Sequence, residues 1–566
     1  MKMTNLGTKT LKNSKEFSSK NATYLSRGAF IDMTMAGAYT FLPLGLRVLN
    51  KIENIIRKEM DTIGTELLMS ALSPQHLWEQ TGRINTVDVL MKTSGANEAS
   101  KKKSTNEYIL NSTQEELITP IAAKFNKSYR DFPFAFYQIQ TKFRNEARAK
   151  SGILRGREFR MKDLYSFHTS EEDLKKYYDH SKTVYTKVFE NLGLGEFTYM
   201  ALASGGDFTK DYSHEFQTKC ASGEDTIFYD KELKIAYNKE VSPSKAETYP
   251  QDTEMKELSD VFGENIKGMK ELAEFLKLPY HKCVKTMIYE IDNGKIIAAA
   301  VRGDYKINEY KLKKVLGSNT LALASEEVIK KVTNAEIGYA GIIGLPETIQ
   351  VIIDDSVENL INFECGANKT NYHTVNVNWG RDINKPDKFF DIKEAKDGDY
   401  NPESNSKFEV FAACEVGNIF PLNTKFSNAF GYTFTDKNEQ KKPVYMGCYG
   451  IGPSRIMGVL VEMFNDEKGI IWPEQVAPFK VHLIDIKSSD NLAEKIYNQL
   501  QELNIEVLFD DRDISTGEKF ADADLIGNPI RLVVSDRNNG KIEWKNRNSN
   551  ESELLEIDEL IKKLTS

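Results

Sequence analysis

The sequence predicts an α+β domain, an antiparallel sheet flanked by helices, which is interrupted by an α/β insertion and followed by a C-terminal α/β domain. Three observations predict this arrangement. Two apolar, aromatic-rich segments, 134–143 and 157–167, bracket a polar loop, as in a long antiparallel hairpin. Between about 228 and 400 the composition changes to alternating strand-like and helical patterns. From about 477, strands and helices alternate with short links, which predicts parallel pairing.

Length and composition set the class of protein. A chain of 566 residues suggests roughly three or four domains, each large enough for its own core. The hydrophobic fraction of 40% and the charged fraction of 28% are those of a soluble globular protein. No apolar run reaches the roughly 18 residues that a membrane span needs, so we expect no membrane contact. With a net charge of −8, a nucleic-acid partner would have to be held by local basic patches.

Cysteine usage and the N-terminal segment indicate the compartment. The five cysteines form no CxxC pair and no Cys/His spacing suited to zinc, so we expect a reducing cytosol and no zinc. The segment MKMTNLGTKTLKNSK has neither an apolar core nor an arginine, so it resembles neither a secretory signal nor a transit peptide. We therefore expect a cytoplasmic protein. The cysteines are Cys220, Cys283, Cys365, Cys414 and Cys448.

The first strong helix follows Pro43. Apolar residues keep a three-four spacing from Leu49 to Ile63, which predicts an amphipathic helix with the proline just ahead of it. Val48 and Ile55 widen the apolar stripe beyond what one packing surface needs. Core packing and a subunit interface both explain a wide stripe.

A short strand and an acidic helix start surround Thr113. Thr113 and Glu116 have the capping-box spacing, so a structural role accounts for part of this motif. Glu115 is not needed for that cap. A carboxylate of Glu115 that faced a pocket could pair with the ammonium of an amino acid.

The hairpin loop carries the clearest charge pattern. Arg144 and Glu146 are two apart, so on a strand their side chains would leave the same face of the sheet. From Arg144 to Glu158 there are five basic and two acidic residues, which suits a phosphate-bearing partner. An ordinary solvated hairpin would also carry such charges.

Three further places hold chemistry-bearing residues. His214 and Glu215 lie on a predicted strand, where a single histidine is more often structural. In the insertion, Lys285, Asp354 and His373 lie at or near strand ends and could line a site. Near 450 a strand, a glycine-rich turn and an apolar helix place Arg455 in the first helical turn, where it could reach a phosphate. This turn matches neither GxGxxG nor GxxxxGK[ST].

These motifs together resemble a known family. LPLG around Pro43, FRNE at 143–146 and GIGPSR at 450–455 are similar to the three signatures of class II aminoacyl-tRNA synthetases. Over nearly the whole chain the sequence resembles the bacterial-type prolyl-tRNA synthetases. The segments that carry this resemblance include TQEE, FYQIQTKFRNE, SHEF, MGCYGIG and WPEQVAPF. The resemblance implies four segments: a catalytic domain in two parts, 1–228 and 403–475, an inserted editing domain, 229–402, and an anticodon-binding domain, 476–566.

The resemblance also implies the reaction and its partners. It implies activation of proline by ATP, with Mg²⁺, to prolyl-adenylate, then transfer to the 3′ end of tRNA(Pro) by a homodimer. The residues that it implies for ATP binding are Arg144, Glu146, Phe159, Glu415 and Arg455. Of these, Arg144, Glu146 and Arg455 would be catalytic, and Glu415 would be a magnesium ligand. For proline it implies Thr113, Glu115, Tyr165, His168, Phe420 and Cys448.

The insertion and the C-terminal domain carry two further implied sites. Hydrolysis of alanyl-tRNA(Pro) would use Lys285, Asp354, His373, Gly341 and Pro346. A pocket sized for proline cannot strongly reject the smaller alanine, because the lost contacts are worth only about 1–3 kcal/mol. Anticodon binding would involve Asp511, Arg512 and Phe520.

Three positions depart from the family pattern, and three rival functions fit the sequence less well. The family commonly has His at Gln114, His at Asn418 and Gly at Asn423, which concerns the amino-acid pocket rather than phosphate binding. Another class II synthetase is a rival that the insertion argues against. A synthetase-like RNA-binding protein would have lost a signature arginine or Glu146, and none is lost. A pure deacylase would not need an intact activation site.

Overall fold

The computed structural model describes residues 1–12, 17–206 and 212–565, and the chain divides into two compact units. The first unit comprises Met1–Met200, Gly205–Glu224 and Ala412–Ser566, and the second comprises Ala201–Ser204 and Asp225–Phe411. Residues 13–15, at the end of the segment MKMTNLGTKTLKNSK discussed above, lie outside the described residues.

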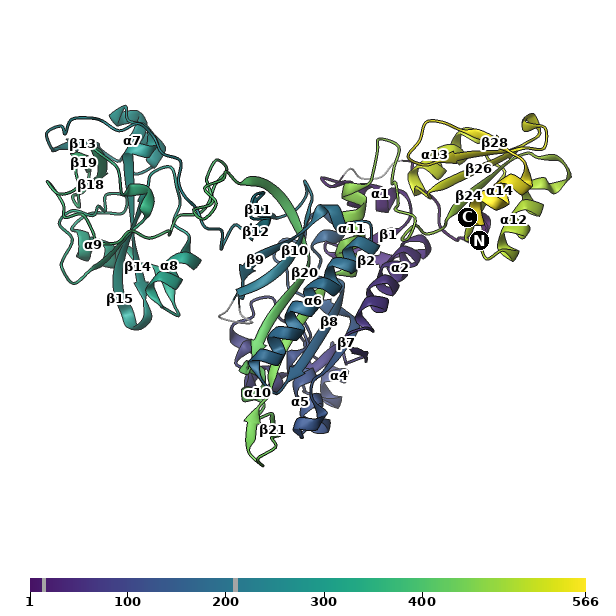
Figure 1. Ribbon diagram of the computed structural model, residues 1–566, viewed down its shortest axis with the longest axis horizontal. Helices are drawn as coiled ribbons and strands as arrows, with labels where there is room; N and C mark the ends of the chain where they lie inside the picture. The colour runs from purple at the N-terminus through teal and green to yellow at the C-terminus, as the bar shows by residue number, and fades with distance from the viewer. Residues whose placement is uncertain (13–16, 207–211, 566) are drawn as a thin grey trace. The chain divides into compact units, whose positions relative to one another are not determined.

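An antiparallel sheet forms the centre of the first unit (Figure 1). Strand β7 (Phe134–Phe143) pairs with β8 (Glu158–His168) from Phe134↔Phe167 to Phe143↔Glu158, which confirms the predicted hairpin. Strand β8 also pairs with β23 (Tyr445–Ile451), and β23 pairs with β20 (Glu409–Asn423). Strand β3 (Thr65–Glu66) lies at one edge, parallel to β7. Strand β10 (Tyr212–Lys219) pairs with β9 (Thr198–Ser204) and, antiparallel, with β20.

Long helices cover one face of this sheet. Helix α2 (Pro43–Met60) begins at Pro43 as predicted, because a proline in the first turn loses no helical hydrogen bond. Its residues Val48, Ile52 and Ile56 are fully buried in one core with residues of α6 (Glu171–Asn191) and of β8. The apolar stripe of α2 is therefore used for core packing within the chain.

Shorter elements complete this part of the first unit. The helices are α1 (Lys20–Arg27), α3 (Gln75–Gln80), α4 (Glu98–Lys103), α5 (Glu115–Phe125), α10 (Lys425–Ala429) and α11 (Pro453–Met463). The small sheets are β1 (Ile31–Met35) with β2 (Ala38–Phe41), β6 (Tyr108–Leu110) between β4 (Leu72–Pro74) and β5 (Met91–Thr93), and β21 (Thr433–Thr435) with β22 (Lys441–Pro443).

The C-terminal segment of the first unit forms its own sheet, in the order β25-β24-β26-β27-β28. The pairs β24–β25 and β24–β26 are parallel, as the short alternating elements predict, and β26–β27 is antiparallel. The elements are β24 (Val481–Ile486), α12 (Leu492–Glu502), β25 (Val507–Asp510), α13 (Thr516–Ile526), β26 (Ile530–Ser535), β27 (Ile542–Asn546), β28 (Glu553–Leu555) and α14 (Ile557–Thr565).

The second unit is a separate α/β module. Its sheet has the order β13-β19-β18-β14-β15-β17, with β16 on β14, and β11 (Asp225–Asp230) pairs with β12 (Ile235–Asn238) as a hairpin. The other elements are β13 (Ser259–Phe262), α7 (Met269–Leu276), β14 (Cys283–Ile291), β15 (Lys295–Arg302), α8 (Glu309–Leu316), β16 (Leu321–Leu323), α9 (Glu326–Thr333), β17 (Gln350–Ile353), β18 (Phe363–Gly366) and β19 (Tyr372–Val377).

Two features of the whole chain complete the description. The five cysteines are buried thiols. Within the part of the chain that the structure describes, no helix has both the length and the apolar character to cross a membrane.

Candidate functional site

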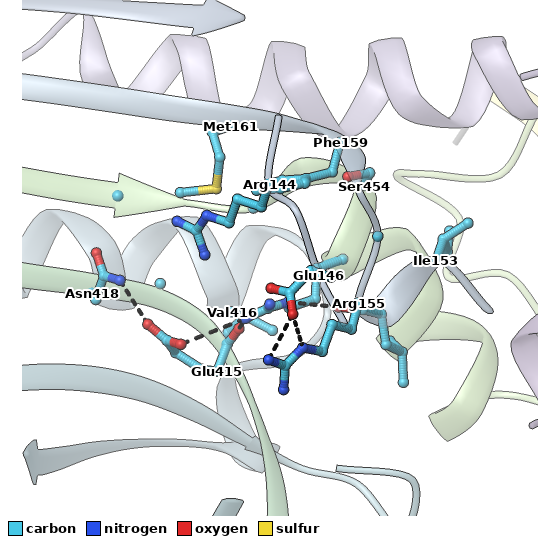
Figure 2. A pocket seen from close by; sticks show the side chains of 16 residues that line it. Arg144, Glu146, Ile153, Arg155, Phe159, Met161, Glu415, Val416, Asn418 and Ser454 are labelled. Atoms are coloured by element: carbon cyan, nitrogen blue, oxygen red, sulfur yellow. Dashed lines mark hydrogen bonds and ion pairs between the residues drawn. The ribbon is translucent and has the colours of Figure 1, made fainter. Parts of the chain in front are cut away.

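A cavity of the first unit lies beside the loop that joins β7 and β8 (Figure 2). Its walls come from this loop, from β8, β20 and β23, and from the start of α11. All five residues that the sequence assigns to ATP line it: Arg144, Glu146, Phe159, Glu415 and Arg455. The cavity therefore gathers residues that are more than 300 positions apart in the chain.

Two guanidinium groups share this cavity. The Arg144 guanidinium lies 5.1 Å from the ring centre of Phe159. Burial lowers the pKa of Arg144, and the positive charge of Arg455 lowers it further. Two cations held in one cavity repel each other until an anion lies between them, so this arrangement suits a polyanion.

Arg455 is held in a fixed direction at the start of α11. Its Nε donates to the carbonyl of Leu154 at 2.8 Å, and its Nη1 donates to the carbonyl of Glu415 at 2.6 Å. Its Nη1 also lies 3.6 Å from Oε2 of Glu415. The N-terminus of a helix carries a partial positive charge, so Arg455 and α11 both favour an anion here.

The predicted strand positions of Arg144 and Glu146 are wrong. Strand β7 ends at Phe143, and only the bond from Arg144 N to Arg157 O continues the hairpin pairing. The backbone then turns, with Glu146 N donating to Arg144 O at 2.8 Å. The two side chains therefore reach the cavity from a turn and not from one face of a strand.

Arg155 is a cavity residue that the sequence argument counted only as a loop charge. Its Nε and Nη2 lie 2.9 Å and 2.7 Å from Oε2 of Glu146 (Figure 2), and its Nη1 donates to Glu224 at 2.6 Å. No periodic pattern in the loop signals this contact. Arg155 thus holds the Glu146 carboxylate in place.

Glu415 is the one residue that the sequence assigns to a metal. The expectation that the departure at Asn418 concerns only the amino-acid pocket is wrong, because Asn418 lines this cavity. Its Nδ2 donates to Oε1 of Glu415 at 2.6 Å and orients this carboxylate (Figure 2). Among the described residues, no group of three or more His, Cys, Asp or Glu could hold a metal ion. Mg²⁺ commonly takes one or two carboxylates plus substrate phosphates, and Glu415 fits such a partial site.

A second group of residues surrounds Glu115, at the start of α5 and on β8, β20 and β23. Thr113 Oγ1 donates to Glu115 Oε2, and Cys448 Sγ lies 3.3 Å from Glu115 Oε1. Tyr165 Oη accepts a hydrogen bond from Gln114 N at 3.1 Å. On the sheet, Cys448 is opposite Tyr165 on one side and opposite Phe420 on the other. The structure therefore gathers five of the six residues predicted to bind proline.

The sixth residue, His168, lies on the other face of the sheet. Successive side chains of a strand alternate between faces, so His168, three positions after Tyr165, points the opposite way. Its Nδ1 lies 2.7 Å from Asp173 of α6, and its Nε2 lies 2.9 Å from Ser166 Oγ. His168 therefore takes part in helix packing rather than in the group around Glu115.

The predicted capping box at Thr113 and Glu116 is wrong. Helix α5 begins at Glu115, and its N-cap residue Gln114 makes no side-chain cap. Glu116 instead contacts Arg83, whose Nη1 lies 2.9 Å from Glu116 Oε1 and 3.1 Å from Glu115 Oε2. Arg83 is more than 30 positions away in sequence, and no local pattern pointed to it.

His214 makes the contacts of a structural residue, which is the more common role of a single histidine on a strand. It is buried, and its Nδ1 lies 2.8 Å from Tyr178 Oη. Burial lowers the pKa of His214 to about 4, so the ring is neutral at neutral pH.

The second unit has a cavity of its own, lined by Lys285 and His373. The Lys285 ammonium donates to Tyr305 O at 2.8 Å, and burial lowers the pKa of Lys285. His373 Nδ1 lies 3.1 Å from Glu364, and its Nε2 lies 3.1 Å from the carbonyl of Ile266. The remaining walls are mostly apolar, from α7, β14, β16 and α9. This cavity suits a small apolar group beside a cation.

The other three residues predicted for that site do not line the cavity. The Asp354 carboxylate is fully buried and accepts hydrogen bonds from the backbone N–H groups of Ser356, Ile392 and Lys393. A Cβ on Gly341 would lie 1.7 Å from the carbonyl oxygen of Gly366, so glycine there permits a close backbone approach. Pro346 ends the same loop. Gly338 and Ala340 are the loop residues that line the cavity.

The residues predicted for the anticodon are engaged within the chain. Asp511 accepts hydrogen bonds from the backbone and side chain of Thr4, at 3.1 Å and 2.6 Å. Arg512 pairs with Asp510 and Asp522 at 2.7 Å and 2.9 Å. Phe520 is partly buried, with the guanidinium of Arg531 4.5 Å from its ring centre. Asp511 and Arg512 follow β25, and Phe520 lies in α13.

Two family models match the chain. Residues 98–464 match the tRNA synthetase class II core domain (G, H, P, S and T), and residues 476–566 match an anticodon binding domain. A proline–tRNA ligase of Bacillus cytotoxicus is 41% identical over 548 residues, which is 96% of this chain and 95% of the relative. Proline–tRNA ligase 1 of Bacillus cereus is 40% identical over the same shares of both chains.

Two solved structures have a similar fold. Prolyl-tRNA synthetase of Cryptosporidium parvum, complexed with L-proline and AMP, has a TM-score of 0.55 at 13% identity, over 96% of this chain and 74% of that one. Prolyl-tRNA synthetase of Giardia lamblia, in complex with prolyl-adenylate, has a TM-score of 0.57 at 14% identity, over 96% and 75%. Together with the family models they confirm the predicted fold class.

Proposed function

The chain belongs to the class II aminoacyl-tRNA synthetases, and within them to the proline–tRNA ligases, and from this premise we propose that the cavity around Arg144 activates proline with ATP. The product is prolyl-adenylate, from which the prolyl group passes to the 3′ end of tRNA(Pro). One observation carries the proposal: Arg144 and Arg455, from distant segments, line one cavity together with Glu146 and Phe159.

Activation depends on alignment and charge neutralisation. A carboxylate oxygen of proline forms a bond to the α-phosphorus of ATP, while the bond from that phosphorus to the diphosphate breaks. Arg144 holds the α-phosphate and Arg455 holds the γ-phosphate, so both guanidiniums stabilise charge that moves during this step. Phe159 stacks on the adenine, and Glu146 fixes the nucleotide.

Proline binds in the second group of residues. Thr113 and Glu115 face its ammonium, while Tyr165, Phe420 and Cys448 surround its ring. The mutual contacts of Glu115 with Thr113 and Cys448 support this assignment. His168, on the opposite face of the sheet, is left out of it.

Glu415 is the candidate Mg²⁺ ligand. When bound, Mg²⁺ would neutralise phosphate charge. Asn418 and Arg455 contact the Glu415 carboxylate and orient it toward the nucleotide site.

The second unit is the candidate editing domain. Alanine enters a proline pocket because it is smaller, and a separate hydrolytic site corrects the error. The apolar cavity with Lys285 and His373 supports this function, with Lys285 gripping the 3′ end of the tRNA. We place the domain at 229–402, between the catalytic segments 1–228 and 403–475.

The segment 476–566 is the candidate anticodon reader, which involves Asp511, Arg512 and Phe520. Its match to an anticodon binding domain supports tRNA as a partner. We further propose a homodimer that acts in the cytoplasm, where aminoacylated tRNA is used.

Proline-dependent exchange of diphosphate into ATP tests the central proposal. We expect Arg144→Ala and Arg455→Ala each to lower the exchange rate by about 10²–10³, as for loss of one charge-stabilising donor. Arg148→Ala, an exposed arginine of the same loop, is the matched control and should keep the parent rate. Undiminished exchange in both cavity variants would refute the assigned roles.

A further inference from the structure

Two adjacent carboxylates at the start of α5 share one buried guanidinium. Glu115 and Glu116 are 0% and 1% exposed, and Arg83, which contacts both, is 3% exposed. Arg83 Nη1 lies 3.1 Å from Glu115 and 2.9 Å from Glu116. A single guanidinium balances one of the two negative charges. The helix N-terminus offsets only part of the second.

The neighbouring groups have charge partners or other contacts of their own. Glu116 also accepts a hydrogen bond from Thr81 Oγ1 at 3.0 Å. The Lys142 ammonium, on the same face of the sheet, forms an ion pair with Asp163 at 2.6 Å and interacts with Glu115 through its longer-range charge. The Lys162 ammonium donates to Tyr185 and to the carbonyl of Tyr449 on the opposite face. Because Lys142 is paired closely with Asp163, the second negative charge of the Glu115–Glu116 pair favours a proton or a cationic ligand.

The protonation of Glu116 follows from this arrangement. Burial and the charge of Glu115 raise the pKa of Glu116 to about 7, against the opposing effect of Arg83. In the ligand-free site at about pH 7, the pair therefore carries about half a proton on average.

We propose that this pair exchanges a proton for the ammonium of proline: Glu116 holds the proton in the empty site and releases it when the ammonium arrives beside Glu115. The inference rests on the proposed function, because it takes proline as the ligand near Glu115. The O–H bond of the Glu116 carboxyl breaks, the proton passes to the buffer, and no covalent bond to proline forms. Two carboxylates then face two cations, Arg83 and the ammonium.

The exchange makes proline affinity depend on pH. An ammonium within a few ångströms favours the charged form of a carboxyl, so by linkage the ionised pair binds proline more tightly. With a pKa of about 7 in the empty site, proline should bind about tenfold more weakly at pH 6 than at pH 8. Arg83 acts here as a positioning residue, because it holds both carboxylates.

Isothermal titration of the full chain with proline tests the proposal directly. Titrations at pH 6, 7 and 8, each in two buffers of different ionisation enthalpy, give the number of protons released. We expect about half a proton at pH 7, fewer at pH 8 and more at pH 6. Cyclopentanecarboxylate, which has the ring and carboxylate but no ammonium, should release none. Proline binding without proton release at all three pH values would overturn the proposal.

A matched pair of variants assigns the proton. Glu116→Gln resembles a permanently protonated carboxyl, so its proline affinity should be no higher than that of the parent at pH 6 and should not change between pH 6 and pH 8. Glu172→Gln, an exposed glutamate of α6, should retain the proton release. If Glu116→Gln kept the parent's proton count, the proton would come from another group and the proposal would fail. If Glu116→Gln did not fold, the parent's proton count would still decide. Absence of proline binding at every pH would instead count against the proposed function.

Discussion

The Arg155 guanidinium holds the Glu146 carboxylate, with Nε at 2.9 Å and Nη2 at 2.7 Å from Oε2. Arg155 is 41% exposed, so we expect this pair to contribute about 0.5–1 kcal/mol to the placement of Glu146. Arg155→Ala should then raise the KM for ATP in the exchange assay about two- to fivefold, with kcat little changed. Arg148→Ala, which leaves Glu146 in place, serves as the control. An unchanged KM in Arg155→Ala would show that Glu146 needs no such support.

The buried pair at Arg83 predicts a pH-dependent stability. Between about pH 4.5, the ordinary value for a glutamate, and about pH 7, the folded state binds more protons at Glu116 than the unfolded state does. This group therefore makes the free energy of unfolding fall as pH rises through that window. Arg83→Ala removes the compensating charge, so it should destabilise the protein by about 3–5 kcal/mol at pH 8 and by less at pH 6.

Thermal melting of Arg83→Ala at pH 6 and pH 8 measures this effect. Arg130→Ala, an exposed arginine, should melt like the parent at both values. If Arg83→Ala lowered the melting temperature equally at the two pH values, Arg83 would not be balancing the charge of an ionising Glu116.

The sequence predicted helices and strands better than it predicted contacts between side chains. The hairpin of β7 and β8 followed from aromatic and apolar patterning, and α2 followed from Pro43 and its three-four spacing, because both signals are local. The capping box failed because Arg83 attracts Glu116, and a contact between residues 33 positions apart has no periodic signature. Arg144 and Glu146 reached the cavity by a turn that no local propensity marks.

One error was avoidable from the sequence alone. Tyr165 lies in the predicted strand segment 157–167, and His168 follows that segment directly, so continuing the strand alternation by one residue places the two side chains on opposite faces. Family resemblance had grouped them in one pocket. Asp354 is the reverse case, because its partners at Ile392 and Lys393 come from a distant loop that the strand pattern could not reveal.

Asp354 predicts a stability effect in the second unit. Its carboxylate accepts three backbone hydrogen bonds and lies 3.8 Å from the Lys393 ammonium, with both side chains 0% exposed. Asp354→Asn keeps the shape but replaces an acceptor oxygen with a donor, so it should destabilise this unit by about 1–3 kcal/mol. Limited proteolysis should then cut within 225–411 faster than in the parent. Asp397→Asn, in a loop of the same unit, is the control. Parent-like proteolysis together with lost hydrolysis would assign Asp354 a chemical role instead.

Lys285 and His373 predict a separation of two activities. Both line the cavity of the second unit, and neither lines the cavity around Arg144, so Lys285→Ala and His373→Ala should leave ATP–diphosphate exchange unchanged. Each should slow hydrolysis of alanyl-tRNA(Pro) by about tenfold to a hundredfold, because the ester and the 3′ end would lose a positioning contact. Lys295→Ala, an exposed lysine at the start of β15, should hydrolyse like the parent. Hydrolysis equal to that of the parent in both cavity variants would remove the editing assignment, while a loss of exchange would show that the variants had damaged the fold of the whole chain.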